Sequence, residues 1–276
     1  MHYNLLKLAL AVAAVSPALA AWPYGPFSYT VPFAKGGGSA SIAELQAPFI
    51  PGSKLVYNAA NSGAAAWANM KNDPKDGSVV TLINLPHTML QPIYPGFVAN
   101  YTFDDIKIAY IHSYTPLALI VPSNSTIQTW ADFVDACRTG NSSMIISGAA
   151  KGTVFDLATL RLKRLARLDV AYESAGDGAN VAITALLQGK YRAAWTTTPA
   201  VFNRPDLRTL AIAAEFEFPQ IDAPTFKELG INYVDGIYRG MGLPAGTPDN
   251  VMQVNLLIRI QRKCSPRTMY AETSHL

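Results

Sequence analysis

The stretch 27–46, FSYTVPFAKGGGSASIAELQ, constrains the fold of this chain more than any other. Alternating apolar residues predict a strand, three glycines interrupt it at 36–38, and a helical pattern follows. The first N–H groups of such a helix lack intrahelical partners and carry the positive end of its dipole, and bare glycine backbone leaves them open to a ligand. The stretch therefore predicts an anion seat with Lys35 at its rim, unless it is an ordinary turn with an N-cap at Ser39 or Ser41.

A second copy of this pattern lies in the middle of the chain. The segment 143–147 (SMIIS) predicts a strand, and a loop bounded by Gly148 and Gly152 follows it with one lysine. Thr153 then leads into an apolar helical pattern over 154–168. Two loops of this kind can face each other across a cleft, so the repetition favours the anion seat over the ordinary turn.

Strands and helices alternate along the chain, which predicts an α/β fold with largely parallel sheets and ligand binding at the carboxyl ends of strands. With 276 residues and 50% hydrophobic composition, the chain can fill the core of one or two lobes. Its net charge of +3 comes from scattered basic residues, which excludes a nucleic-acid partner of the usual kind. After the first strand, the patterns predict strands at 54–57, 79–83, 106–111, 117–121, 143–147, 170–172, 192–197 and 207–213, and helices at 42–49, 64–70, 125–139, 154–168 and 180–187.

The N-terminus has the form of a secretory signal peptide. Lys7 supplies the basic region, residues 5–15 are apolar, and Ala18-Leu19-Ala20 provides a cleavage site, so the mature chain is expected to begin near Ala21. A short membrane anchor is the alternative, but neither this run nor a later one is long enough to span a bilayer. The sequence therefore predicts a soluble protein of the periplasm or the extracellular space.

No motif for catalysis, a metal or a cofactor is present. The serine hydrolase, zinc protease and P-loop motifs are missing, and a dinucleotide fingerprint would need glycine in place of Ser41. His87 and His112 stand alone, and the adjacent carboxylates Asp104-Asp105 point apart. We therefore predict a binding protein and no enzyme. The two cysteines, Cys137 and Cys264, favour two unpaired buried thiols over a disulfide.

Two further features have plain explanations. The basic residues of the second helix are expected on a solvated face, although they could meet an acidic membrane or partner; they are Arg161, Lys163, Arg164 and Arg167. Three glycosylation sequons begin at Asn100, Asn124 and Asn141, a number close to chance for this length.

A set of short motifs runs in order over most of the mature chain. They are Trp22-Pro23, Pro32-Phe33 with Gly36-Gly37, Asn58 with Gly63-Ala64, Asp76-Gly77, Ser147 with Gly152, 186–189, 224–230 (PTFKELG), and Gly240 with 243–248 (LPAGTP). The ordered set resembles the extracytoplasmic solute-binding proteins of tripartite tricarboxylate transporters, the Bug family. The resemblance implies a two-lobed periplasmic-binding-protein (Venus-flytrap) fold with mostly parallel sheets and a central cleft.

The resemblance also implies a domain organisation. After the signal peptide at 1–20, the first lobe comprises 21–121 and a return at 224–255, and the second lobe comprises 122–223. The family continues into further helices past Asn255, whereas 263–276 is polar and without periodicity, so 256–276 is expected to be a divergent, truncated tail that leaves apolar surface of the first lobe uncovered.

The implied function is an exported receptor, a monomer, that delivers a small carboxylate, such as a di- or tricarboxylate, to membrane permease subunits. Alanine at 40 and glutamate at 44 replace the family's aspartate and arginine, 171–174 (AYES) replaces Pro-Tyr-x-Gly, and Thr196 stands where an acid is frequent. Without the aspartate, a plain carboxylate is favoured over an amino acid. The alternative is a secreted, glycosylated protein that keeps the fold without a transporter. The implied ligand-binding residues are Gly36, Gly37, Gly38, Ser39, Ser147, Gly148, Gly152, Thr153, Thr196 and Thr197.

Overall fold

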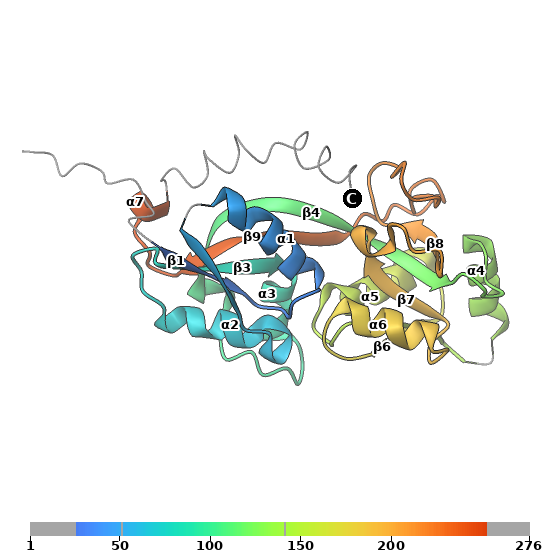
Figure 1. Ribbon diagram of the computed structural model, residues 1–276. Coiled ribbons are helices and arrows are strands. Elements are labelled where there is room, and N and C mark those ends of the chain that lie inside the picture. Colours follow the sequence, from blue (N-terminus) through green and yellow to red (C-terminus); the bar gives the residue numbers. More distant parts are fainter. Residues whose placement is uncertain (1–25, 51, 141, 253–276) are drawn as a thin grey trace, which may run out of the picture.

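Residues 26–50, 52–140 and 142–252 are described from a computed structural model (Figure 1). They form a nine-stranded sheet in the order β2-β1-β3-β9-β4-β7-β5-β6, with β8 also paired to β4. The strands are β1 Phe27–Val31, β2 Ser53–Tyr57, β3 Val79–Leu85, β4 Ile106–Pro122, β5 Met144–Gly148, β6 Val170–Ser174, β7 Ala193–Thr197, β8 Leu207–Ile212 and β9 Gly236–Pro244. The helices are α1 Gly38–Gln46, α2 Ala64–Asn69, α3 His87–Leu90, α4 Trp130–Thr139, α5 Val154–Ala166, α6 Ala179–Leu187 and α7 Asp249–Met252.

The molecule has two halves, and two long strands, β4 and β9, run between them (Figure 1). The first part of β4 pairs with β9, which also pairs with β3, and this first half contains β1 to β3 with α1 to α3. The second part of β4 pairs with β7 and β8, and this second half contains β5 to β8 with α4 to α6. β4 therefore passes from one half into the other.

The structure corrects the prediction of two separate strands at 106–111 and 117–121. They are one strand of 17 residues, because the polar residues between them still pair with β9, for example Tyr114 with Tyr238. β9 was not predicted, since its glycines weaken the strand pattern. Those glycines allow neighbouring strands to approach: a Cβ atom at Gly240 would lie 2.1 Å from the carbonyl oxygen of Tyr110, and one at Gly242 would lie 2.8 Å from Ile83.

The sheet is mixed. β1 pairs in parallel with β2 and β3, and β5 pairs in parallel with β6 and β7, as the alternation of strands and helices predicts. The pairs of β9 with β3 and of β4 with β7, β8 and β9 are antiparallel. Parallel pairing thus characterises the outer strands of each half, and antiparallel pairing the crossing strands that join the halves.

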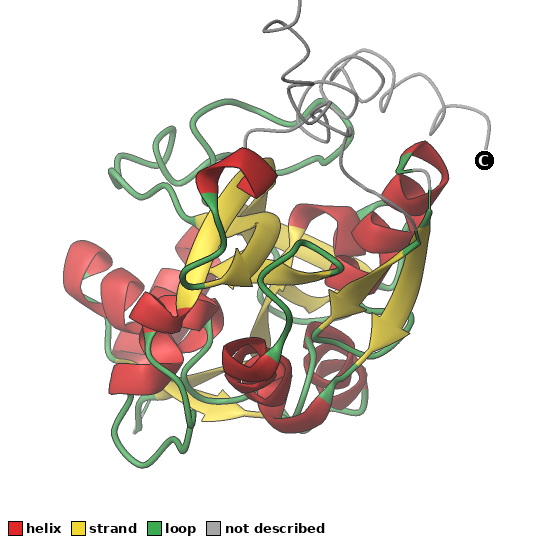
Figure 2. Cartoon of the chain, turned by 90° about the vertical axis from the view of Figure 1, so that its left-hand side faces the viewer, coloured by secondary structure: helices red, strands yellow, loops and turns green. Residues whose placement is uncertain are grey.

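In the first half, helices cover both faces of the sheet (Figure 2). Successive side chains of a strand point to opposite faces, so Leu82 packs with Ala40 and Ala43 of α1, whereas Ile83 packs with Trp67 of α2. The Trp67 indole also donates to the carbonyl of Leu82 at 3.0 Å. β3 is therefore buried on both faces, which explains its continuous apolar run.

The second half repeats this arrangement on β4. Leu117, Leu119 and Val121 pack in one core with residues of α4 and α5, and Ala118 and Ile120 pack in another with residues of α6. All five side chains are fully buried. The alternation again gives each face of the strand its own layer of helices.

The segment 224–235 packs against the second half. Phe226 and Tyr233 are buried in the same core as Trp195, and the N–H of Phe226 donates to the carbonyl of Ile212 at 2.9 Å. The division into lobes stays a prediction; these contacts favour a return to the first half at Gly236, where β9 begins, over one at 224.

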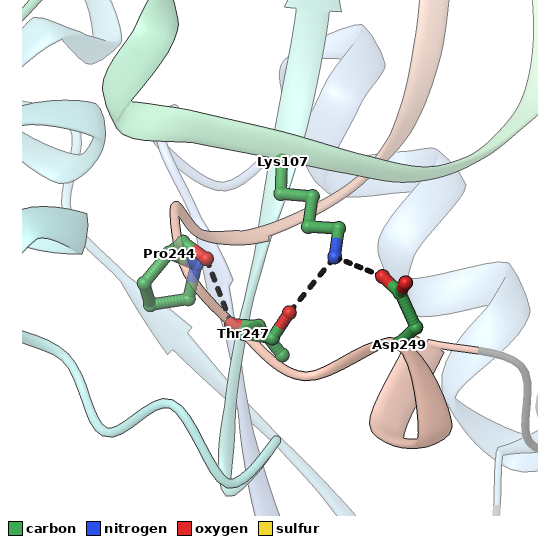
Figure 3. Close-up of polar contacts among 4 residues, drawn as sticks. All are labelled: Lys107, Pro244, Thr247 and Asp249. Carbon is green, nitrogen blue, oxygen red and sulfur yellow. Dashed lines mark hydrogen bonds and ion pairs between the residues drawn. The ribbon is translucent and has the colours of Figure 1, made fainter.

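A polar cluster fixes the turn after β9 to β4 (Figure 3). The ammonium of Lys107 lies 2.8 Å from the carbonyl oxygen of Thr247 and 2.6 Å from the carboxylate of Asp249. The Thr247 hydroxyl donates to the carbonyl of Pro244 at 2.7 Å. The carbonyl contacts are buried or half-buried, whereas the Asp249 carboxylate is exposed, so the backbone contacts carry most of the stabilisation.

The signal peptide, Ala21, Cys264 and the divergent tail lie outside the described residues. Cys137 is a buried free thiol, and burial raises its pKa to about 11. Among the residues that are described, no helix combines the length and apolar character needed to cross a membrane.

Candidate functional site

A pocket of about 290 Å³ lies between the two halves of the molecule. The first half contributes Lys35, the start of α1, and side chains from β3 and α3. The second half contributes the loops that lead into α5 and α6. Thr197 at the end of β7 and Arg239 of β9 complete the wall from the centre of the sheet.

The start of α1 presents backbone N–H groups to this pocket. Gly37 is the N-cap and has no side chain to cap the helix, and Gly38 and Ser39 line the pocket. The Ser39 hydroxyl is held instead by Asn84, whose Nδ2 donates to it at 3.0 Å. Gly36 has φ +79°, in the left-handed region that favours glycine. The first loop therefore has the form that the sequence predicts.

The start of α5 faces the pocket from the other half. Thr153 is its N-cap, but its hydroxyl donates to the carbonyl of Ala150 at 2.8 Å and makes no capping hydrogen bond. Ala149, Thr153 and Phe155 line the pocket. This loop and the first loop thus face the same cavity from opposite halves.

The start of α6 is a third helix N-terminus at the pocket, which the sequence analysis did not assign to the site. Gly178 is its N-cap, with φ +90° and no side chain to cap the helix, and Asp177, Ala179 and Asn180 line the cavity beside it. The signal was present in the sequence: a strand, a loop with two glycines and a helix follow one another here as well.

Arg239 is a buried cation in the pocket wall, with 3% of its surface exposed. Its Nε donates to the Ser39 hydroxyl at 3.1 Å and its Nη1 to the Thr115 hydroxyl at 2.7 Å. Burial lowers the pKa of the guanidinium to about 10, so it stays charged at neutral pH. Within the described part of the chain, no carboxylate forms an ion pair with it.

Two histidines near Arg239 are neutral. His87 lines the pocket with 3% exposure, and burial, followed by the charge of Arg239, lowers its pKa to about 3. The same two causes lower the pKa of His112 to about 4. Nδ1 of His87 and both ring nitrogens of His112 have no hydrogen-bond partner among the described residues. Neither histidine is therefore poised as a base near neutral pH.

Five of the ten residues assigned to the site line the pocket: Gly37, Gly38, Ser39, Thr153 and Thr197. Thr196 does not, because adjacent strand residues point to opposite faces; it is fully buried and its hydroxyl has no partner within the described ranges. The Ser147 hydroxyl is also buried and donates to the carbonyl of Glu173 at 3.0 Å.

The three remaining glycines shape the loops around the cavity. Gly148 lies under α5, where a Cβ atom would come within 2.7 Å of Phe155. Gly152, with φ +73°, faces Tyr94 and Phe97 of the first half at ordinary contact distance. The carbonyl of Gly36 accepts a hydrogen bond from the Asn180 side chain at 3.0 Å. These glycines therefore position the backbone, and the structure does not place them on the pocket lining.

Hydrogen bonds join the two halves around the pocket. The Asn180 contact with Gly36 is one of them, and the Ser62 hydroxyl donates to the Asp177 carboxylate at 2.5 Å. The phenol of Tyr94 donates to the carboxylate of Asp156 on α5. The two halves thus contact each other at several points of the rim.

Other candidate features of the sequence lie away from this cavity. Arg161, Lys163 and Arg164 of α5 and Arg167, its C-cap, are exposed. Arg161 pairs with Asp235 at 2.8 Å, and Lys163 with Asp169 at 3.1 Å. Nowhere in the described ranges do three or more histidine, cysteine or acidic side chains gather in a way that could hold a metal ion.

Two α/β halves, joined by crossing strands and enclosing a pocket lined by helix N-termini, define a solute-binding protein with the periplasmic binding protein fold. Residues 53–273 match the model of the TctC family, described as "Tripartite tricarboxylate transporter family receptor", and the chain belongs to this family of solute receptors. The match includes most of the segment that we expected to diverge.

Solved structures have the same fold. A protein described as a periplasmic transporter superimposes with a TM-score of 0.80 at 19% identity, covering 91% of this chain and 87% of its own. MatC from Rhodopseudomonas palustris, solved with bound malate, gives 0.74 at 21% identity, with 88% and 85% covered. Another R. palustris protein, solved with adipate, gives 0.75 at 21% identity, with 84% and 80% covered.

The chain is also similar in sequence to a protein of Pseudomonas sp. strain P51 described as "UPF0065 protein in tcbD-tcbE intergenic region". The two are 24% identical over 246 residues, which are 85% of this chain and 73% of the relative. The family is one of binding proteins, so the chain is a receptor and not a catalyst.

Proposed function

We propose that this chain is an exported receptor that binds a small dicarboxylate between its two halves and delivers it to the permease subunits of a tripartite transporter. The observation that carries the proposal is the meeting of three helix N-termini, those of α1, α5 and α6, at one pocket, none of them capped by a side chain. Free N–H groups at helix starts bind anions, and several of them around one cavity suit a ligand with more than one carboxylate.

Three further observations support a dicarboxylate. Two relatives of the same fold were solved with malate and with adipate, both four- to six-carbon dicarboxylates. The cavity of about 290 Å³ is near the lower end of the range for small-molecule sites and suits a ligand of that size. Lys35 on the lining adds positive charge at the rim.

A plain dicarboxylate is preferred over an amino acid. Ala40 is buried in the core and offers no acceptor for an ammonium group. Asp177 is the acidic side chain of the lining, and one of its carboxylate oxygens accepts the hydrogen bond of Ser62. Malate carries a hydroxyl group where aspartate carries an ammonium group, so the two acids form a matched pair of ligands for this comparison.

Calorimetric titration of the mature chain with malate, adipate, citrate and aspartate tests the proposal. We expect binding of at least one dicarboxylate, with malate bound more tightly than aspartate. At a ligand concentration of about 100 times Kd, the free energy of unfolding should rise by about 2.7 kcal/mol, which a thermal-shift measurement detects. The neutral diamide of malic acid is the control. Absence of heat with every acid, in a folded sample, contradicts the proposal.

Export and the transporter partner form the second part of the proposal. The apolar segment 5–15 and the site Ala18-Leu19-Ala20 support cleavage after Ala20. Expression of the full chain in a bacterium should yield a periplasmic product whose mass corresponds to a start at Ala21. Glycans on a product from the native host would favour the secreted alternative instead.

A further inference from the structure

We propose that Arg239 selects the charge of the ligand by forming a buried ion pair with one of its carboxylates. The proposal rests on the carboxylate receptor proposed above. It names the residue of the pocket wall, between α1 and the crossing strands, that would bind a carboxylate of the ligand. Backbone N–H groups alone bind any hydrogen-bond acceptor, whereas a buried guanidinium requires an anion.

The contacts of Arg239 leave one side of the guanidinium free. Nε and Nη1 donate to neutral hydroxyls, those of Ser39 and Thr115, at 3.1 and 2.7 Å. Nη2 lies beside Gly38, because a Cβ atom there would be 3.3 Å from it, and it donates to no residue of the described chain. The free edge therefore lies next to the first turn of α1, where backbone N–H groups are also unpaired.

The charge of Arg239 has no compensation within the described chain. A buried cation costs several kcal/mol unless an anion pairs with it, and hydroxyl groups offset only part of that cost. A ligand carboxylate at the free edge would supply the missing negative charge and gain from the low polarity of the site.

The position of Arg239 also links the ligand to the strands that join the two halves. Arg239 lies on β9, opposite Asn84 of β3 on one side and Ser113 of β4 on the other. Thr115 of β4 and Ser39 of α1 hold its other nitrogens. A carboxylate bound here is thereby connected to both crossing strands and to the first helix N-terminus.

Replacement of Arg239 by methionine, combined with calorimetry, tests the proposal with malate and adipate as probes. We expect Arg239→Met to weaken binding by 30-fold or more, the usual effect of removing one partner from a buried charge pair. Arg239→Lys, which keeps the charge but loses the planar fork, should weaken it less. The matched control is Arg161→Met, which removes an arginine paired with Asp235 away from the pocket and should leave affinity within twofold.

Thermal unfolding without ligand separates this role from a structural one. Removal of an unpaired buried charge should leave the unfolding midpoint of Arg239→Met equal to or above that of the wild type. A lower midpoint, or a variant that does not fold, means that Arg239 is structural and overturns the proposal; Arg239→Gln repeats the measurement with a polar side chain.

The outcomes for the two proposals are distinct. If the wild type binds a probe and Arg239→Met binds it within threefold, the role of Arg239 is overturned and the carboxylate receptor stands. If the wild type binds neither malate nor adipate but another acid, the same variants are measured with that acid. If it binds no acid, the proposed function fails and the role of Arg239 fails with it.

Discussion

At the scale of single residues, burial decides which groups of the pocket wall carry charge. Arg239 stays charged because the usual pKa of its guanidinium is so high that burial lowers it only to about 10. The imidazole of His87 has an ordinary pKa near 6.5, so a loss of hydration of the same kind leaves it neutral at physiological pH. In the pocket wall, the buried positive charge of Arg239 therefore lies near the neutral ring of His87, while Lys35 adds a second positive charge at the rim.

The low pKa of His87 predicts a dependence of stability on pH. In the unfolded chain His87 takes up a proton near pH 6.5, whereas in the folded protein it does so only near pH 3. Its contribution is therefore complete above pH 6.5 and is lost as the pH falls from there, by up to about 1.4 kcal/mol per pH unit. Urea unfolding should show that His87→Gln loses less stability between pH 7 and pH 5 than the wild type does. An equal loss in both proteins would contradict this assignment.

At the scale of elements, α4 has a side-chain cap at its start, whereas the helix starts at the pocket have none. In α4 the Thr129 hydroxyl accepts from the N–H of Asp132 at 3.1 Å, and the Asp132 carboxylate accepts from the N–H of Thr129 at 2.9 Å. This capping box explains why α4 begins at Trp130 and not at Ser125, as the sequence analysis predicted. The starts of α1, α5 and α6 have no such contact.

Replacement of the α4 cap should therefore affect stability and not binding. We expect Thr129→Ala to lower the free energy of unfolding by about 1 kcal/mol, since it leaves an N–H group of the helix unpaired. Thr139→Ala, at the other end of α4, is the matched control and should change it by less than about 0.5 kcal/mol. Chemical unfolding measures both, and calorimetry should give the wild-type affinity for each. A change in affinity with Thr129→Ala would argue against separate roles for capped and open helices.

At the scale of the whole molecule, two halves on shared strands meet again at the rim of the pocket. The strands β4 and β9 connect the two halves through the backbone. Side chains such as Tyr94 and Asp156 connect them again by a hydrogen bond at the rim of the pocket. Burial, followed by the contact with Asp156, raises the pKa of Tyr94 to about 12, so its phenol remains a donor at neutral pH. Ligand binding and these rim contacts should therefore both favour the arrangement in which the two halves contact each other around the pocket.

Removal of the Tyr94 hydroxyl tests this coupling. Tyr94→Phe keeps the ring but loses the bond across the rim, and we expect ligand affinity to fall about three- to tenfold, equivalent to ~1 kcal/mol. X-ray scattering without ligand should show a larger radius of gyration than for the wild type.

Tyr191→Phe is the matched control for this test. Its hydroxyl donates to the Glu173 carboxylate at 2.7 Å within the second half, so affinity and radius should stay unchanged. Equal effects of the two variants would mean that the Tyr94 bond does not couple the halves.

The local features of the fold could be predicted from the sequence. The strand, glycine loop and helix at 27–46, the second copy before Thr153, and the doubly covered strand β3 all follow from periodicity and glycine placement, because their causes lie within a few residues. The order of family motifs also predicted the receptor family, to which the chain belongs.

Which of these parts contact one another could not be predicted from the sequence. Arg239 contacts Ser39 across 200 positions of the chain and Thr115 across 124 positions, and no local pattern reports such pairings. The glycine-rich strand β9 has a weak strand pattern in the sequence. Its glycines are explained by the close approach of β3 and β4, which leaves no room for side chains there. Burial of charge is likewise a property of the assembled sheet, since an arginine in a sequence is expected at the surface until its surroundings are known.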